Sequence, residues 1–211
     1  MVDLHCHILP GLDDGAPTME VSIAMAESAI ADGITHVVAA PHSSNEYFFD
    51  FAQVRQLRDE LQAKVGDRLK IATGCDFHLN PENLVSLRKD ARQYCINQRD
   101  FLLVEFNEFS IPPSMDQTLH EIQLAGVQPV ITHPERNAIL RPRPERLKKW
   151  VRLGCFAQRI QRRLRIAHEG THGFGHPASG GHFEPCDRGV DSGLSPSRRY
   201  AAMMSTPGPS C

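Results

Sequence analysis

Residues 101–132 begin with Phe101-Leu-Leu-Val-Glu-Phe106 and end with Val127-Gln-Pro-Val-Ile-Thr132. Both apolar runs have the length of buried strands, and the segment between them, Met115 to Leu124, predicts a helix that ends at Gly126. Successive strands joined through a helix lie parallel in one sheet. Nearly continuous apolar strands are typical of a parallel sheet with both faces covered. The pattern therefore predicts an α/β fold.

The same alternation continues on both sides of this unit, between residue 2 and Ala157. Thr18 is a suitable N-cap for one helix, and glycines follow several of the expected helices. Further strands are expected at residues 2–6, 35–40, 69–73 and from 155, and further helices at 18–31, 50–65, 143–153 and from Asn80-Pro81. The repeated order predicts a parallel sheet, either open or closed into a barrel.

Composition limits the kinds of partner. The chain has 211 residues, 41% of them hydrophobic, and 23 Lys+Arg against 25 Asp+Glu give a net charge of −2. This balance argues against nucleic acid or an anionic membrane as the main partner. No segment resembles a signal peptide or a membrane span, so we expect no direct membrane insertion. Six scattered cysteines without a CxxC pair fit the reduced thiols of a cytoplasmic protein.

The composition changes abruptly after Ala157. Residues 158–211 contain seven Arg and no Lys, eight Gly, five Pro and six Ser, without a period of 2 or 3.6. One interpretation is a natural disordered tail. The other, which we favour because the change falls within an expected strand, is a replaced terminus such as a translation frame change produces. We therefore expect a folded domain at 1–157 and an atypical tail at 158–211 that adds no regular strand to it.

Side chains that can bind metal follow successive strands. Active sites of parallel α/β folds lie at the carboxyl ends of the strands, which is where these residues fall. They are His5, His7, Asp14, His42, Asp76, Glu105 and His133. Each alone could be an ordinary hydrogen-bonded residue at the rim of the sheet, but together they predict a metal site.

Two features strengthen this prediction. His5 and His7 are two residues apart, which directs both imidazoles to one side of a strand. Glu105 lies in an apolar run, where a carboxylate needs cations or hydrogen-bond donors. Nitrogen and oxygen ligands suit Mn, Fe, Zn or Mg. The set exceeds one coordination sphere, so we expect two or three ions with Glu105 as a bridge.

Such clusters activate water and neutralise phosphoryl oxygens, and the neighbouring residues fit this chemistry. Arg136 could hold a phosphate with two parallel hydrogen bonds, or could instead form a salt bridge with Glu135 or Asp14. Asp14 is a candidate for proton transfer. In a cysteine phosphatase an arginine follows the cysteine after five intervening residues, but here that position is Leu12, so we expect no cysteine-phosphatase chemistry.

Three motifs resemble a known family: residues 3–15 (DLHCHILPGLDDG), Ala40-Pro-His42 and Ile131-Thr-His133-Pro-Glu-Arg136-Asn. They are similar to the polymerase-and-histidinol-phosphatase (PHP) superfamily, in particular its bacterial manganese-dependent tyrosine phosphatases of capsule and exopolysaccharide synthesis. The resemblance implies a distorted (β/α)7 barrel around three metal ions, with the seven residues above as ligands, Mn²⁺ as the first expectation, and Arg136 on the phosphate. It also implies a substrate, the phosphotyrosine-bearing tail of a membrane-associated tyrosine autokinase.

The sequence departs from the family pattern at two places. Asp76 stands where the family usually has Glu. The family's last strand carries an Asp-x-His pair, and residues beyond Ala157 contain none, since we interpret His168, His172, His176 and His182 as incidental. A barrel without its last strand is therefore expected. Three alternatives stay open: an impaired or inactive relative, a phosphotyrosine-binding module without turnover, and a phosphatase acting on a small-molecule phosphate. The oligomeric state is not predicted.

Overall fold

The computed structural model describes residues 1–160 and 181–182. The strands are β1 (Val2–Cys6), β2 (His36–Ala39), β3 (His42–Ser43), β4 (Lys70–Thr73), β5 (Asp76–His78), β6 (Phe101–Glu105), β7 (Gln128–Thr132), β8 (Phe156–Ile160) and β9 (Gly181–His182). The helices are α1 (Met19–Ala31), α2 (Phe51–Val65), α3 (Pro81–Lys89), α4 (Met115–Leu124) and α5 (Pro144–Arg152). Short 3-10 turns occupy Gly66–Arg68, Arg92–Tyr94 and Ile96–Gln98.

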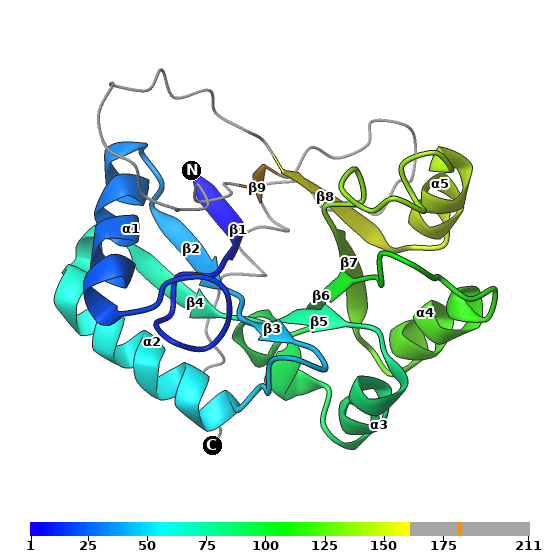
Figure 1. Cartoon of the computed structure of the whole chain (residues 1–211), viewed down its shortest axis with the longest axis horizontal. Helices are drawn as coiled ribbons and strands as arrows, with labels where there is room; N and C mark the ends of the chain where they lie inside the picture. The colour runs from blue at the N-terminus through cyan, green and yellow to red at the C-terminus, as the bar shows by residue number, and fades with distance from the viewer. Residues whose placement is uncertain (161–180, 183–211) are drawn as a thin grey trace.

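The predicted α/β architecture with parallel sheets is confirmed (Figure 1). One sheet has the order β1-β2-β4, and the other has the order β3-β5-β6-β7-β8-β9. Every pairing from β1 to β8 is parallel, whereas β9 pairs antiparallel with β8. None of the described helices combines the length and the apolar character needed to cross a membrane.

The division into two sheets adds a feature that the sequence analysis did not predict. His42 and Asp76 follow strands β2 and β4 as expected, but they also begin the short strands β3 and β5, which pair with each other. The bends before these strands are bridged by bonds from Gly74 N to Ala39 O (2.9 Å) and from Asp76 N to Pro41 O (3.0 Å). Strands of two or three residues are too short to produce a recognisable period, so the sequence pattern could not reveal them.

The helices begin and end close to where the sequence predicts. Thr18 Oγ1 accepts a hydrogen bond from Val21 N at 3.4 Å, Asp50 Oδ1 from Ala52 N at 2.8 Å, and Asn80 Oδ1 from Asn83 N at 2.7 Å. These caps satisfy backbone donors that have no partner within the helix. They therefore set the points at which α1, α2 and α3 begin.

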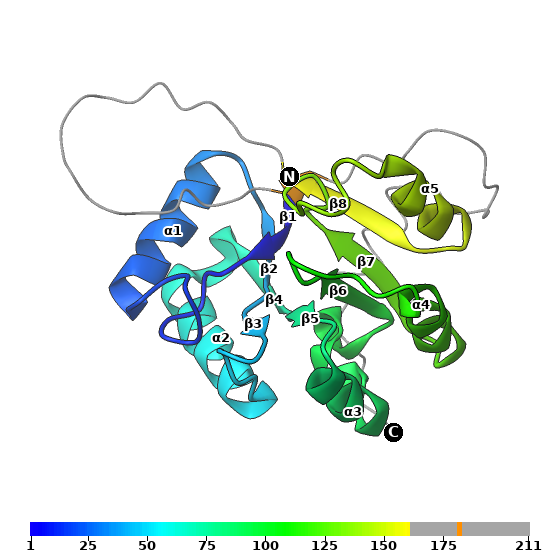
Figure 2. The ribbon, with the colours of Figure 1, turned by 45° about the vertical axis from the view of Figure 1, so that its right-hand side comes forward.

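Both faces of the strands are buried, which explains their nearly continuous apolar sequences. The helices lie on the outside of the curved strands (Figure 2). Leu102 and Val104 of β6 belong to the large core under the helices, which also includes Trp150 of α5. Leu103 points to the opposite, inner face and packs with Val130 of β7. The inner face is therefore closed by apolar residues below the carboxyl ends of the strands.

Strand β8 extends three residues past Ala157, the predicted end of the domain. It pairs with β7 through Ile131↔Ala157 and Thr132↔Gln158. Gln158 is only 1% exposed, so a polar residue that gives no strand signal is nevertheless buried in the sheet. Strand β9 lies beside β8 and β1 (Figure 2). The expectations for the rest of the tail, including His168, His172 and His176, lie outside the described residues.

Candidate metal centre

Eight side chains gather at the carboxyl ends of the strands. They form four overlapping groups in which the potential ligand atoms lie within 4.8 Å of one another. The groups are His5, His7 and Asp76; His7, Asp14 and His42; His42, His78 and Glu105; and Asp76, Glu105 and His133. The structure thus brings together all seven residues that the sequence singled out, and it adds His78.

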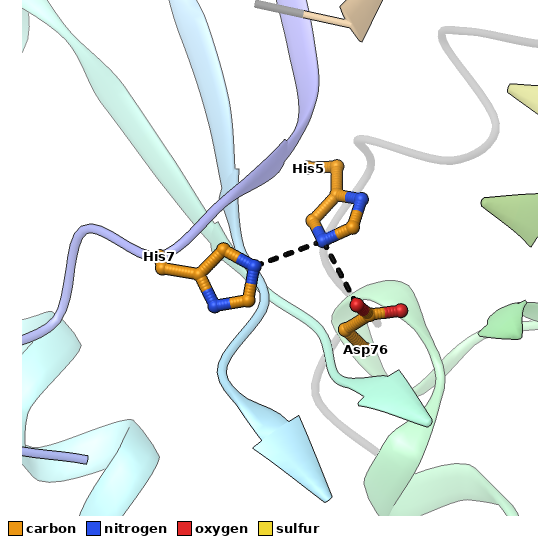
Figure 3. Close-up of side chains that lie close together, drawn as sticks. All are labelled: His5, His7 and Asp76. Carbon is orange, nitrogen blue, oxygen red and sulfur yellow. Dashed lines mark hydrogen bonds and ion pairs between the residues drawn. The ribbon is translucent and has the colours of Figure 1, made fainter. Parts of the chain in front are cut away.

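The first group joins β1 to β5 (Figure 3). His5 Nε2 lies 3.1 Å from His7 Nε2 and 3.2 Å from Asp76 Oδ2. The register of β1 against β2 shifts between Asp3 and Cys6, and such a bulge re-aims side chains. The imidazole nitrogens of His5 and His7 therefore converge on the carboxylate of β5.

A second convergence centres on His42. His42 Nδ1 lies 3.4 Å from Asp76 Oδ2 and 3.5 Å from Glu105 Oε2, and Glu105 Oε1 lies 3.6 Å from His133 Nε2. Among the described residues, His42 Nδ1 and Asp76 Oδ2 are buried without a hydrogen-bond partner. Buried polar atoms without partners are costly, and a divalent cation would satisfy both. The imidazole and carboxylate donors also fit Mn, Fe, Zn or Mg.

The local electrostatics place negative charge in the middle of the cluster. Asp76 is fully buried, which opposes ionisation, but the charge of His5 and the polar approach of the His133 and His5 imidazoles hold its pKa well below the usual value. Burial lowers the pKa of His42, although the charge of Asp76 acts in the opposite direction. A neutral imidazole keeps the lone pair that a metal requires. His42 is therefore suited to bind a cation without first losing a proton.

His133 is held in a conformation that non-glycine residues rarely adopt, with φ of +29°. Its burial opposes protonation, but the hydrogen bond to Asp76 and the charges of Asp76 and Glu105 raise its pKa. Thr132 Oγ1 donates to Val104 O at 3.1 Å, and Arg136 N donates to His133 O at 2.9 Å. The end of β7 is thereby tied on both sides of the strained residue.

Asp13 is a site residue that the sequence analysis missed. Its side chain is 1% exposed and its carboxylate accepts bonds from His7 Nδ1 (2.6 Å), His42 N (2.9 Å) and Gly15 N (3.0 Å). Burial opposes ionisation, but these bonds, that of His7 above all, lower its pKa. The neighbouring Asp14 is 55% exposed and lies 3.6 Å from His42 Nε2. The Asp-Asp-Gly run contained both residues, but it could not show which carboxylate points inward.

A pocket adjoins the cluster on the side of β6 and β7. Glu105, Thr132, His133, Arg136 and Asn137 contribute to its lining. Arg136 is exposed there, whereas Asn137 is buried and its Nδ2 donates to Phe106 O at 3.2 Å. The predicted phosphate-binding arginine therefore lies beside the residues that could hold metal.

The cysteines within the described residues are buried. Burial raises the pKa of Cys6 and Cys75 well above the usual value, and that of Cys95 to about 12. A nucleophilic cysteine must be an accessible thiolate. These thiols are therefore unsuited to attack a phosphate, as the spacing around Cys6 predicted.

The family model for capsular polysaccharide synthesis, CpsB/CapC, matches residues 1–164. The chain belongs to the CpsB/CapC family.

Relatives of this CpsB/CapC chain are tyrosine-protein phosphatases. It is 34% identical over 166 residues to tyrosine-protein phosphatase YwqE of Bacillus subtilis, a match that covers 75% of this chain and 63% of YwqE. It is 28% identical over 166 residues to tyrosine-protein phosphatase CpsB of Streptococcus pneumoniae, covering 75% of this chain and 66% of CpsB. The chain thus spans slightly less than two thirds of the length of these relatives.

The fold also matches a solved structure of this family. It is one of the crystal structures of YwqE from Bacillus subtilis and CpsB from Streptococcus pneumoniae, which are unique metal-dependent tyrosine phosphatases. The match has a TM-score of 0.68 and 36% identity, and it covers 75% of this chain and 66% of the solved one. The predicted family resemblance is therefore confirmed.

Proposed function

We propose that this protein is a metal-dependent phosphatase that hydrolyses phosphotyrosine in a capsular or exopolysaccharide synthesis system. The observation that carries the proposal is the convergence of imidazoles and carboxylates at the carboxyl ends of the parallel strands, in a chain of the CpsB/CapC family. The names of its relatives support tyrosine phosphate as the substrate group.

The proposed metal ligands are the seven residues that the sequence singled out. They are His5, His7, Asp14, His42, Asp76, Glu105 and His133. Their four overlapping groups share members, which favours two or three neighbouring ions with Glu105 as a bridge. We propose Mn²⁺ as the cofactor. Fe, Zn and Mg are alternatives, because they also bind nitrogen and oxygen ligands.

The residues around the proposed ions have separate tasks. Divalent ions held by these residues would supply an activated water and would neutralise phosphoryl oxygens. Arg136 binds the phosphate from the adjoining pocket, where its guanidinium is accessible. Asp14, which is partly exposed next to His42, or a water network held by the metal would take a proton from the attacking water and pass it to the leaving oxygen.

For the whole protein, we propose action in the cytoplasm on the phosphotyrosine-bearing tail of a membrane-associated tyrosine autokinase. The four buried free cysteines of the described residues fit a reducing compartment. We also propose that the curved parallel strands belong to a distorted (β/α)7 barrel. The fold similarity to the family structure is consistent with this architecture, and a closing strand would lie between β1 and β8, where the short β9 pairs with β8 and contacts β1.

A turnover assay tests the proposal. We expect the full-length protein to release phosphate from a phosphotyrosine peptide when Mn²⁺ is added and to lose this activity with a chelator. His42→Ala should abolish turnover, whereas Cys6→Ser should retain most of it, because the Cys6 thiol is buried and protonated. Inactivity of a folded protein that carries its metal would contradict the proposal.

One sequence observation favours a second candidate function. Residues beyond Ala157 contain no Asp-x-His pair, which the family resemblance places on the last strand. A relative without two ligands would bind phosphotyrosine or metal with little turnover. The two candidates are separated by measuring peptide binding and phosphate release on the same metal-loaded sample. Comparing a phosphotyrosine peptide with small phosphate esters also tests the third possibility, a small-molecule substrate.

A further inference from the structure

We infer that His78 is an additional metal ligand, and that His42, His78 and Glu105 together bind one divalent cation. This inference rests on the proposed metal-dependent function, but it adds a residue that neither the sequence motifs nor the family resemblance singles out. The three residues lie on the neighbouring strands β3, β5 and β6.

The strand register directs His78 into the cluster. Asp76 and His78 are two residues apart on β5, so they project from the same side of the strand. In the parallel pairing of β5 with β6, Asp76 is opposite Leu103 and His78 is opposite Glu105. Leu103 belongs to the inner apolar cluster. Asp76, His78 and Glu105 therefore share the inner face.

Three imidazoles surround the Glu105 carboxylate, and only that of His78 approaches it closely. Its Oε2 contacts His78 Nε2 directly and lies 3.5 Å from His42 Nδ1, while its Oε1 lies 3.6 Å from His133 Nε2. The rings of His42 and His78 meet edge to face, with centroids 5.3 Å apart. The nitrogen and oxygen lone pairs of these side chains are ligands that a shared cation could coordinate.

A simple hydrogen bond between His78 and Glu105 does not account for His42. His42 Nδ1 is buried and, within the described part of the chain, has no hydrogen-bond partner. A cation between these side chains would coordinate His42 Nδ1, His78 Nε2 and a Glu105 oxygen together. The side chain of His78 is 30% exposed, so this position also opens toward solvent and has room for an exchangeable ligand.

This position draws its protein ligands only from residues 42–105. A cation there does not depend on any side chain beyond Ile160. Asp76 is one methylene shorter than the Glu of the family pattern and therefore reaches less far into the cluster. The His78 imidazole, two residues later on the same face, would supply an additional ligand there.

Metal stoichiometry provides the first test. Full-length protein, His78→Ala and the control His120→Ala are dialysed against Mn²⁺, and bound metal is measured by elemental analysis. His120 is exposed on α4, so its removal takes away one imidazole without touching the cluster. We expect His78→Ala to lose one ion per chain at a concentration that saturates the unaltered protein, and His120→Ala to lose none.

A ligand exchange protects the test against misfolding of the alanine variant. His78→Cys loaded with Co²⁺ should show a thiolate-to-cobalt charge-transfer band that is absent from the Co²⁺-loaded unaltered protein and from His120→Cys. Full metal content in His78→Ala together with no new band in His78→Cys would overturn the role of His78 while leaving the proposed centre intact. If the unaltered protein binds no metal, the proposed function and this inference fail together.

Discussion

Asp13 shows how one buried side chain can control a cluster that it does not join. It accepts bonds from the His7 imidazole and from the backbone of His42, so it orients two of the proposed ligands. Residues that hold a ligand through its second nitrogen set both the tautomer and the ring orientation. The buried Asp13 therefore orients ligands, whereas the next residue, the partly exposed Asp14, is free to take part in the chemistry.

We predict that Asp13→Asn weakens Mn²⁺ binding by about 10- to 100-fold. The neutral amide no longer supports the His7 imidazole by charge, although the shape of the side chain is preserved. Titration calorimetry measures the affinity directly. Asp67→Asn is the matched control, because Asp67 is 94% exposed and far from the cluster, and it should leave the affinity unchanged. Equal affinities for both variants would show that Asp13 has no orienting role.

Gly15 occupies a place where no side chain fits. A Cβ added there would lie 2.2 Å from His7 O and 2.4 Å from His7 Cβ. We predict that Gly15→Ala displaces His7 and reduces the number of bound ions. Gly33→Ala is the comparison, since Gly33 has φ of +77° and open space around it. It should cost roughly 1 kcal/mol of stability through backbone strain and leave metal content unchanged.

At the scale of elements, α4 and α5 are joined through one carboxylate. Asp116 of α4 accepts hydrogen bonds from Trp150 Nε1 at 2.7 Å and from Lys149 Nζ at 2.5 Å, both on α5. Trp150 is 1% exposed, so its N–H has no access to water. Arg146 adds a cation–π contact, 4.9 Å above the Trp150 ring. The two helices are therefore positioned by polar bonds at the edge of the core.

We predict that Asp116→Ala lowers the free energy of unfolding by about 1–3 kcal/mol, because the buried Trp150 N–H loses its acceptor. Hydrogen bonds from Lys149 and Trp150 lower the pKa of Asp116. Its ionised contribution is therefore complete above the unfolded pKa of about 3.9 and is lost as the pH falls through the lower folded value. Urea unfolding at neutral pH and near pH 3 should show the difference between the two proteins narrowing with acid. Glu27→Ala, which removes an exposed pair with Arg68, should lower the free energy of unfolding less than Asp116→Ala does.

At the scale of the whole molecule, β1 and β8 are the outermost parallel strands of the arrangement. Strand β9 lies beside both, but it is two residues long and antiparallel to β8. The family pattern expects a parallel strand with an Asp-x-His pair in this region, and residues beyond Ala157 contain no such pair. Two fewer ligands leave the remaining carboxylates with less compensating charge.

We predict that a chimera in which residues 161–211 are replaced by the corresponding segment of YwqE binds more Mn²⁺ and unfolds at a higher temperature. Its turnover of a phosphotyrosine peptide should exceed that of the present chain by at least tenfold, which corresponds to about 1.4 kcal/mol of transition-state stabilisation. The same chimera with the Asp and His of the added pair changed to Ala is the control. An unchanged metal content in the chimera would show that the present chain already holds a full set of ions.

Much of the fold could be predicted because its signals are local. Thr18, Asp50 and Asn80 are caps that act on backbone groups two or three residues away, and continuous apolar runs such as residues 101–104 indicate strands buried on both faces. The short strands β3 and β5 could not be predicted, because their pairing partners, not their sequences, make them strands. The continuation of β8 past Ala157 was not predicted, because Gln158 is polar and the sequence gives no sign that it is buried.

The sequence by itself determined the α/β order and which residue types reach the carboxyl ends of the strands, since both follow from periodicity along the chain. Only the tertiary structure decided that Asp13 is buried behind His7 and His42 while Asp14 stays partly exposed beside them, because that depends on the approach of His7 and His42. It alone placed His78 against Glu105, since the pairing of β5 with β6 joins residues that are distant in sequence. Contacts of this kind depend on strand register, and register is settled by the packing of the whole sheet.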